Sequence, residues 1–133
     1  MMQPGTGGAP AQVIAALGSP PGGSVIIQFV VKTLVGMLDW GGLNPQQAVS
    51  MIDFGSANTP TSNVGGEHPL VDTTDDGAHD PLVRGGLRER GEEVSVDEQS
   101  SGLSAIMRHE AGWIGGADPR REGAVMGDDA ALR

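Results

Sequence analysis

Residues 17–40 read Leu-Gly-Ser-Pro-Pro-Gly-Gly-Ser-Val-Ile-Ile-Gln-Phe-Val-Val-Lys-Thr-Leu-Val-Gly-Met-Leu-Asp-Trp. Prolines and glycines come first, and a long apolar run follows. This order predicts a short strand, a glycine turn and then the N-terminus of a helix. Backbone N–H groups in a first helical turn lack intrahelical partners, and the helix dipole makes that end partly positive. Gly22 and Gly23 are therefore candidates for an anion or oxyanion site; the alternative is a tight turn in which glycine only satisfies a φ requirement.

An amphipathic pattern predicts a helix over residues 24–40, ended by the glycine pair that follows. Apolar residues recur at every fourth position and continue on an adjacent row, and we expect this side to pack in the core. Each buried aliphatic side chain is worth roughly 1.5–3 kcal/mol. Gln28, Lys32 and Gly36 fall on the opposite side. The apolar side consists of Ile26, Ile27, Val30, Val31, Leu34, Val35 and Leu38.

Local signals predict elements on both sides of this helix. Residues 12–17 are a short apolar run between turn residues, which favours a buried strand. Residues 44–47, Asn-Pro-Gln-Gln, have the N-cap, N1 and N3 residues of a helix that is expected to end near Met51. Residues 57–80 are polar and without apolar period, so we expect an irregular or disordered loop there. Residues 127–133 are expected to be a disordered tail.

The second half of the chain is predicted to add strands. Asp80-Pro81 begins a helix that Gly91 ends, and residues 93–96 alternate like an edge strand. Residues 103–109 and 112–116 predict a hairpin around a two-residue turn. Together with residues 12–17, these segments give an antiparallel sheet of about four strands with two to three helices, an α+β arrangement.

Composition excludes several classes of function. The chain has 133 residues, a net charge of −9 and no cysteine. A strongly acidic chain repels a phosphate backbone and an anionic membrane surface, so we expect neither nucleic acid nor membrane as a partner. The apolar run is too short to span a bilayer, and no signal peptide pattern opens the sequence. The sequence leaves the compartment open: periplasmic, secreted and cytoplasmic locations all fit.

Metal-ligating patterns are weak. Residues 72–77, Asp-Thr-Thr-Asp-Asp-Gly, have the start of a calcium loop, but Val83 stands where the twelve-residue pattern requires Glu. A solvated acidic loop is the simpler interpretation. His68, His79 and His109 lack zinc spacing and are expected at the surface. We therefore expect no metal and no organic cofactor.

Several segments occur in a specific order across nearly the whole chain. They are Gly-Ser-Pro-Pro-Gly-Gly-Ser at 18–24, Met-Leu-Asp-Trp-Gly at 37–41, Pro-Gln-Gln-Ala-Val at 45–49, Asp-Phe-Gly-Ser at 53–56, Ser-Gly-Leu-Ser-Ala-Ile at 101–106 and Gly-Ala-Asp-Pro-Arg-Arg-Glu-Gly at 116–123. This order resembles the γ-glutamyltransferase (γ-glutamyltranspeptidase) family. The chain is similar to the C-terminal part of that family's small subunit.

The resemblance implies a fragment of the four-layer αββα fold of N-terminal-nucleophile hydrolases. Members of the family expose a threonine by self-cleavage, and this threonine takes the γ-glutamyl group of glutathione and passes it to water or an amino acid. The family's paired glycines supply the N–H groups of the oxyanion hole, and by the motif they are Gly22 and Gly23. The family has one proline in this turn, whereas this chain has Pro20 and Pro21.

The resemblance also implies that the catalytic nucleophile lies outside this chain. The family's Thr-Thr-His motif precedes the glycine pair; Thr73-Thr74 follows it and is succeeded by Asp75. We therefore expect the isolated chain to be inactive, with the rest of the precursor and a glutathione-like substrate as partners. Asp118 and Arg120 are expected to form a structural ion pair.

Two alternatives remain open on the sequence. One is an N-terminal-nucleophile acylase acting on another amide, such as a cephalosporin side chain. The other is a non-catalytic structural fragment. A chain without its neighbouring layers exposes apolar surface, so we also expect the isolated material to form a dimer or higher oligomer.

Overall fold

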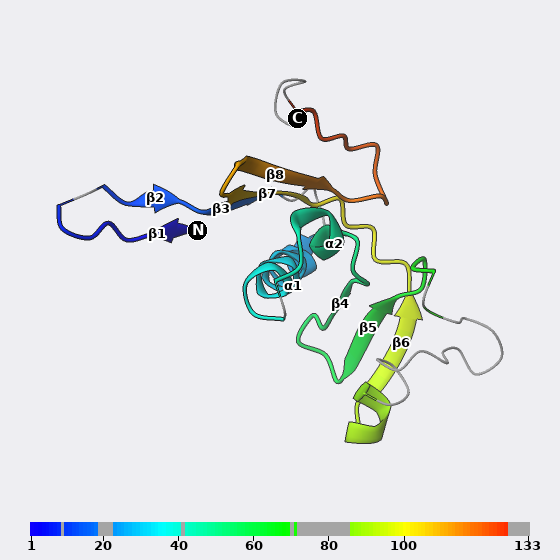
Figure 1. Cartoon of the computed structure of the whole chain (residues 1–133). Coiled ribbons are helices and arrows are strands. Elements are labelled where there is room, and N and C mark those ends of the chain that lie inside the picture. The colour runs from blue at the N-terminus through cyan, green and yellow to red at the C-terminus, as the bar shows by residue number, and fades with distance from the viewer. Residues whose placement is uncertain (9, 19–22, 41, 70, 72–85, 128–133) are drawn as a thin grey trace.

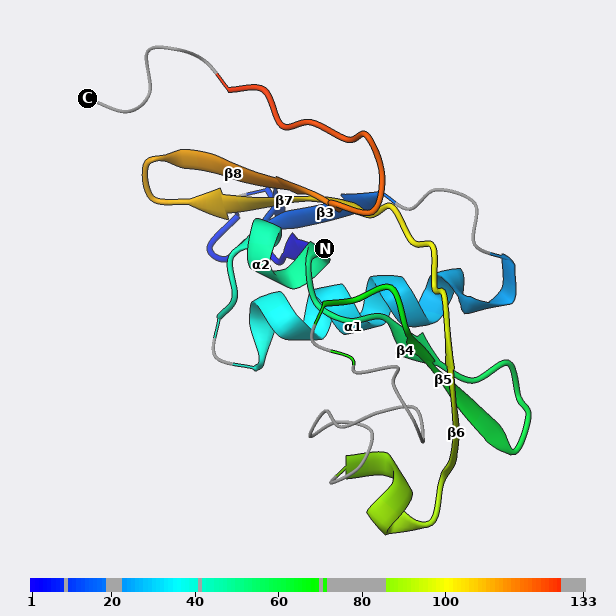
Figure 2. The same cartoon turned by 90° about the vertical axis from the view of Figure 1, so that its right-hand side faces the viewer.

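The computed structural model describes residues 1–8, 10–18, 23–40, 42–69, 71 and 86–127. Helix α1 (Ile26–Leu38) runs through the middle of the molecule, with a three-stranded sheet on each side of it (Figures 1 and 2). The short helix α2 (Pro45–Val49) fills the space between α1 and the first sheet. The strands are β1 (Met2–Gln3), β2 (Gln12–Val13), β3 (Ala15–Gly18), β4 (Phe54–Gly55), β5 (Thr61–Gly65), β6 (Glu93–Asp97), β7 (Ser104–His109) and β8 (Gly112–Ala117).

The first sheet has the order β3-β7-β8 and is antiparallel throughout. Ala15 pairs with Met107, and Ser104 pairs with Ala117 on the other side. The predicted hairpin is confirmed, with His109 opposite Gly112 across a two-residue turn. The predicted strand over 12–17 is confirmed as two pieces, because Ile14 interrupts it between β2 and β3. The short β1–β2 pair extends beyond the sheet as an arm (Figure 1).

The second sheet has the order β4-β5-β6, and its last pair is parallel. Strand β5 lies within the segment expected to be irregular, so that expectation is wrong for Thr61–Gly65. The polar sequence of β5 has no alternating apolar pattern that would predict a strand. The segment forms a strand because its backbone pairs with β6, which lies about thirty residues later in the chain, and Val64 is fully buried in this sheet. Residues 72–80 and 128–133 of the predicted loop and tail lie outside the described residues.

The α+β class is confirmed, but the described strands form two three-stranded sheets and one two-stranded pair. Two apolar clusters correspond to the three-stranded sheets. The larger lies between the first sheet and the helices, and the smaller lies on the second sheet. The buried members of the larger cluster are Ala15, Phe29, Met37, Ala48, Val49, Leu103 and Ala105.

Helix α1 is confirmed, although its end and its buried face differ from expectation. Asp39 occupies the C-cap in place of the glycine pair; Gly42 has φ +69°, and Gly41 lies outside the described residues. The expectation that the whole apolar side is buried is wrong. Ile27 is 73% exposed and Val31 50% exposed, whereas Lys32 is buried.

On the opposite side of α1, Lys32 and Gly36 are buried and Gln28 is half-buried, because each of them meets a partner on the chain from Leu43 to Ser56. The Gln28 side chain bonds the backbone of Ser56, and the Lys32 ammonium bonds Asp53. Gly36 lets Met51 approach closely, since a Cβ there would lie 3.2 Å from its sulfur. Tertiary partners therefore override the amphipathic pattern.

Helix α2 begins as predicted and rests directly on β8. Asn44 and Gln47 form the reciprocal capping box, and Pro45 occupies the first turn. A Cβ on Gly116 would lie 2.5 Å from the backbone nitrogen of Gln46, so only glycine fits between the strand and the helix. The Gln46 side chain also bonds the backbone of Ala117 in both directions, at 2.9 and 3.1 Å.

We predict that Gly116→Ala destabilises the chain by about 1–3 kcal/mol or more, because the added methyl meets backbone atoms that cannot rotate away. Gly115→Ala is the matched control, since its methyl meets only the side chain of the exposed Val125. Urea unfolding measures both variants. Equal destabilisation by the two substitutions would contradict this account of the contact between α2 and β8.

Candidate functional site

The glycine turn before α1 is the first candidate site. Gly23 opens a 3₁₀ turn (Gly23–Val25) that continues directly into α1. Gly23 has φ +61°, and nothing lies within 4 Å of the position that a Cβ would take. Its conformation therefore favours glycine, and its surroundings are open. Gly22, the other member of the predicted pair, lies outside the described residues.

The N-terminal end of α1 carries no compensating side chain among the described residues. Neither the 3₁₀ turn nor the first turn of α1 contains an acidic residue, and Val25 at the N-cap makes no side-chain hydrogen bond. The partial positive charge of this end is therefore left for another group. Such an uncompensated helix end suits an oxyanion.

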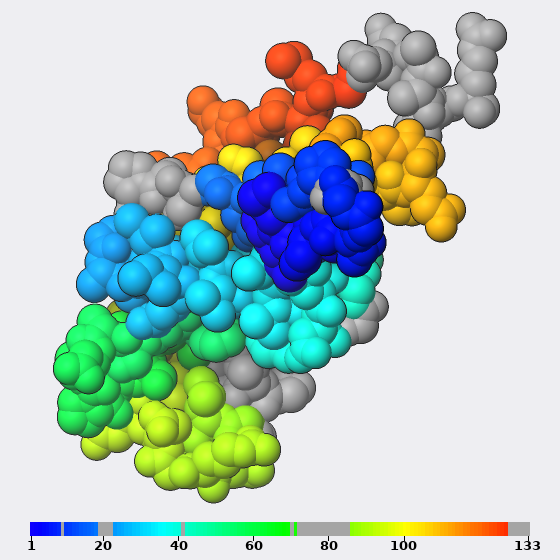
Figure 3. Space-filling view, turned by 90° about the vertical axis from the view of Figure 1, so that its left-hand side faces the viewer, coloured from blue at the N-terminus to red at the C-terminus, as the bar shows by residue number. Residues whose placement is uncertain are grey.

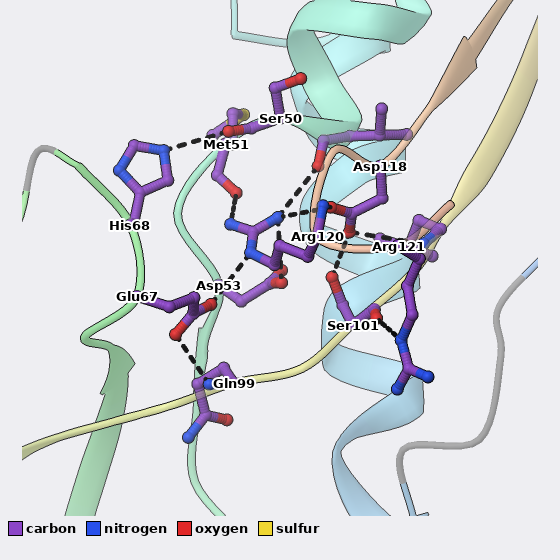
Figure 4. A network of polar contacts seen from close by, with 12 residues as sticks. Ser50, Met51, Asp53, Glu67, His68, Gln99, Ser101, Asp118, Arg120 and Arg121 are labelled. Atoms are coloured by element: carbon purple, nitrogen blue, oxygen red, sulfur yellow. Dashed lines mark hydrogen bonds and ion pairs between the residues drawn. The ribbon is translucent and has the colours of Figure 1, made fainter. Parts of the chain in front are cut away.

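A buried polar network between the two sheets is the second feature. Figure 4 shows the Arg120 guanidinium at its centre. Arg120 donates to Glu67 at 2.9 Å and to Asp118 at 3.0 Å, and lies 3.5 Å from Asp53. It also donates to the carbonyl of Met51 at 2.8 Å. The ion pair expected between Asp118 and Arg120 is present, and it belongs to this larger network.

Asp118 joins the end of β8 to the segment before β7. Its carboxylate accepts from the Ser101 hydroxyl, from the backbone N–H of Leu103 at 3.4 Å and from the backbone N–H of Arg120 at 2.9 Å. Burial alone would raise the pKa of this carboxyl. The hydrogen bonds from Ser101 and Arg120 and the nearby guanidinium outweigh burial, so the pKa of Asp118 is lowered.

Lys32 and Asp53 join α1 to the same network. The Lys32 ammonium lies 2.7 Å from one Asp53 oxygen and donates to the carbonyl of Met51 at 3.1 Å. Burial lowers the pKa of Lys32, and Asp53 offsets only part of that effect. Burial alone would lower the pKa of Arg120, but the nearby carboxylates of Asp53 and Asp118 outweigh burial, so the pKa of Arg120 is raised. The network therefore pairs two buried cations with carboxylates from three segments of the chain.

Sequence reasoning found only two members of this network. The helical pattern places Lys32 on the polar side of a helix, and no local pattern indicates a role for Asp53 or Glu67. A lysine one turn after a glutamine is an ordinary pattern for a solvated face, so no local signal marks these side chains as buried. The network is a scaffold, since its members bond one another.

Two of the three histidines lie within the described residues, and they sit on different parts of the fold. A ring nitrogen of His68 lies 3.1 Å from the carbonyl oxygen of Ser50, and His109 is exposed on the hairpin. Across the described ranges, no group of three or more His, Cys, Asp or Glu side chains is placed to hold a metal ion. The acidic segment 72–77 and His79 lie outside those ranges. No helix within them is long and apolar enough to cross a bilayer.

An apolar groove of about 390 Å³ follows the exposed side of α1. The surface of α1 lies open on one face of the molecule, between the N-terminal arm and the second sheet (Figure 3). No charged side chain is exposed in the groove, because Lys32 turns inward to Asp53. Its lining residues, named the α1 groove below, are Ile27, Gln28, Val31, Lys32, Val35, Trp40, Phe54 and Gly55.

Comparisons with known proteins agree with this arrangement. The fold is that of the N-terminal-nucleophile hydrolases of the transpeptidase type. The family model described as gamma-glutamyltranspeptidase matches residues 2–128, so the chain belongs to the gamma-glutamyltranspeptidase family. No curated protein matches the sequence.

Solved structures share the fold at low identity. Gamma-glutamyltranspeptidase from Pseudomonas nitroreducens complexed with L-DON has a TM-score of 0.70 and 22% identity, covering 96% of this chain and 62% of that one. An acivicin-inhibited gamma-glutamyltranspeptidase has a TM-score of 0.65 and 23% identity, and the alignment covers 92% of this chain and 61% of that one. Cephalosporin acylase from Bacillus halodurans has a TM-score of 0.67 and 23% identity, and the alignment covers 86% of this chain and 20% of that one. The chain thus spans less than two thirds of these chains.

We predict that Asp118 makes the stability of the chain depend on acid pH. Its pKa is lower in the folded state than its ordinary value of 3.8, so its contribution is fully present well above pH 3.8. That contribution is lost as the pH falls through 3.8 toward the folded pKa. Asp118→Asn should cost roughly 3 kcal/mol at pH 7 and flatten this acid dependence.

Urea unfolding at pH 7 and at about pH 3, a range set by the linkage relation, measures both effects. Glu110→Gln, which removes an exposed carboxyl on the hairpin turn, is the control. If Asp118→Asn and the native chain lost equal stability between the two pH values, Asp118 would not be the group responsible.

Proposed function

We propose that this chain is the C-terminal part of the small subunit of a γ-glutamyltransferase. The enzyme transfers the γ-glutamyl group of glutathione to water or to an amino acid. Membership of the gamma-glutamyltranspeptidase family over residues 2–128 is the observation that carries this proposal. The glycine turn that opens α1 supports it, because it presents a positive φ and an open backbone at a helix N-terminus.

The chain's own contribution to the reaction is electrostatic. Attack on the γ-glutamyl carbonyl places negative charge on its oxygen, and the N–H groups of Gly22 and Gly23 stabilise that oxyanion. An acyl-threonine forms when the threonine oxygen bonds the carbonyl carbon and the amine leaves with a proton. Water or an amino acid then takes the acyl group and releases the threonine.

The nucleophile is supplied by the rest of the precursor, so the isolated chain is inactive. The acivicin-inhibited relative is described as having critical roles for its C-terminus in autoprocessing and catalysis. That description supports a catalytic contribution from a chain that lacks the nucleophile.

An acylase acting on another amide is the second candidate. The similarity to cephalosporin acylase from Bacillus halodurans, with a TM-score of 0.67, favours it specifically. Both reactions need an oxyanion hole and an acyl-enzyme, so the glycine turn serves either. The substrate assay decides between them.

The α1 groove is the surface that the rest of the precursor covers. Ile27, Val31 and Trp40 are each at least half exposed there, and such contiguous apolar surface marks an interface. The matching Pseudomonas nitroreducens chain has more than a third of its length beyond the part aligned here. We therefore assign the groove to an apolar segment of that remaining part.

Turnover of γ-glutamyl-p-nitroanilide tests the activity. We expect none from this chain alone and release of p-nitroaniline from the same chain extended upstream to its natural start. Hydrolysis of a cephalosporin side chain by the extended form, without γ-glutamyl turnover, would favour the acylase. A folded extended form that accepts neither substrate would favour a non-catalytic fragment. Activity of the short chain would overturn the assignment of the nucleophile.

Val31→Asp tests the groove. Because Val31 is already half exposed, the isolated chain should lose less than about 0.5 kcal/mol. In the extended protein, a charge buried in an apolar interface should lower the yield of soluble assembled enzyme severalfold. Val13→Asp, on the exposed N-terminal arm, is the control and should leave the yield unchanged.

Size-exclusion chromatography of the isolated chain adds a second readout. Self-association that Val31→Asp abolishes would show a second copy on the groove in place of the missing segment. Equal assembly of the Val31→Asp and Val13→Asp proteins would contradict an interface on α1.

A further inference from the structure

Gln28 makes a two-point contact with the backbone of the second sheet. Its amide nitrogen donates to the carbonyl of Ser56 at 2.5 Å, and its amide oxygen accepts from the backbone N–H of Ser56 at 2.7 Å. Ser56 directly follows β4, which is the outer strand of the order β4-β5-β6. The side chain thus bonds the free edge of this strand in the way that another strand would.

Gly55 is the complement of this contact. A Cβ at Gly55 would lie 1.8 Å from the amide oxygen of Gln28, so the glutamine occupies the volume that any other residue would need. Gly55 is not among the glycines with positive φ. Glycine at this position therefore leaves the space that the Gln28 amide occupies in this contact, and its backbone conformation does not require glycine. Gln28, Gly55 and Ser56 are named the glutamine clasp.

The clasp lies in the first turn of α1. Gln28 is the third residue of α1, and the 3₁₀ turn that begins at Gly23 continues into the helix without a break. Val25 at the N-cap packs against the larger apolar cluster but makes no side-chain hydrogen bond, so the clasp is the polar contact described for this end of the helix. Lys32 and Gly36 hold the same side of the helix one and two turns further on. The clasp is the contact on this side that lies nearest to the glycine turn.

We propose that Gln28 is a positioning residue for the glycine turn. By tying the first turn of α1 to β4, it fixes where the backbone N–H groups of residues 23–25, which directly precede α1, point. Only the last step, from a fixed turn to a faster reaction, rests on the proposed function. The electrostatic stabilisation of an oxyanion depends steeply on donor position, so a displaced turn costs rate without changing the donors themselves.

Two variants break the clasp from opposite sides. Gln28→Met keeps the length of the side chain and removes both hydrogen bonds, whereas Gly55→Ala expels the glutamine without altering α1. Gln28→Glu keeps the acceptor for the Ser56 N–H and loses the donor to its carbonyl. Gly115→Ala, whose methyl meets a movable side chain on the first sheet, is the matched glycine control.

Backbone ¹⁵N relaxation of the full chain is the first measurement. In the native chain we expect order parameters of about 0.85 at residues 23–26, the value of rigid backbone. Gln28→Met and Gly55→Ala should lower them below about 0.6, while the β7–β8 hairpin stays rigid and shows that the chain is folded. Gln28→Glu should lie between, and Gly115→Ala should match the native chain. Unchanged order at residues 23–26 in both clasp variants would overturn the proposal.

Kinetics of the extended, active enzyme are the second measurement. Loss of positioning should lower kcat about tenfold to a hundredfold and leave KM nearly constant. Gln28→Glu should recover part of kcat, which a purely structural side chain would not do. Full kcat in Gln28→Met and Gly55→Ala would overturn the proposal even if the turn became mobile.

The two measurements separate this inference from the function on which it rests. If the native extended protein shows no γ-glutamyl turnover while relaxation responds as expected, the proposed function fails and the clasp stands. If the enzyme is active and both clasp variants behave as native, the clasp fails and the proposed function stands.

Discussion

The buried charge network around Arg120 is the constraint on which the rest of the structure depends. Its guanidinium holds carboxylates or carbonyls from the end of β8, from the segment before β4 and from the segment after β5. Lys32 brings α1 to the same place through Asp53. Removing one partner from a buried ion pair typically costs about 3–5 kcal/mol, because the other charge is left unpaired. Each charge in the network therefore depends on its partners, and together these contacts fix how the two sheets lie relative to α1.

That constraint gives α1 two sets of neighbours. One side of the helix packs on the first sheet through Phe29 and Met37, while the side with Gln28 and Lys32 faces the second sheet. A helix held from both directions places its N-terminus precisely, which is the property that an oxyanion site requires. Under the proposed function, the charged residues act on the reaction through the rigidity of one helix and do not touch the substrate.

The third side of α1 remains uncovered. Ile27 and Val31 belong to the same apolar pattern as Val30 and Leu34, yet only the latter pair packs against the core of this chain. The apolar stripe of α1 is therefore wider than the core of this chain covers. Exposed apolar surface of this kind marks an interface with another segment. The Pseudomonas nitroreducens chain extends beyond the part aligned with this one, and the proposed function assigns that remaining part to the uncovered side of α1.

The sequence by itself determined the local elements and the family. The capping box at Asn44, the turn between β7 and β8 and the period of α1 depend on neighbours within a few residues, so they could be predicted. The tertiary structure alone decided that β5 pairs with β6, that Lys32 is buried and that Gln28 bonds Ser56. These contacts join residues roughly twenty to thirty positions apart, and a polar side chain looks the same in sequence whether it faces water or a distant partner. The burial of a polar group is stable only when that partner arrives, and folding brings it there.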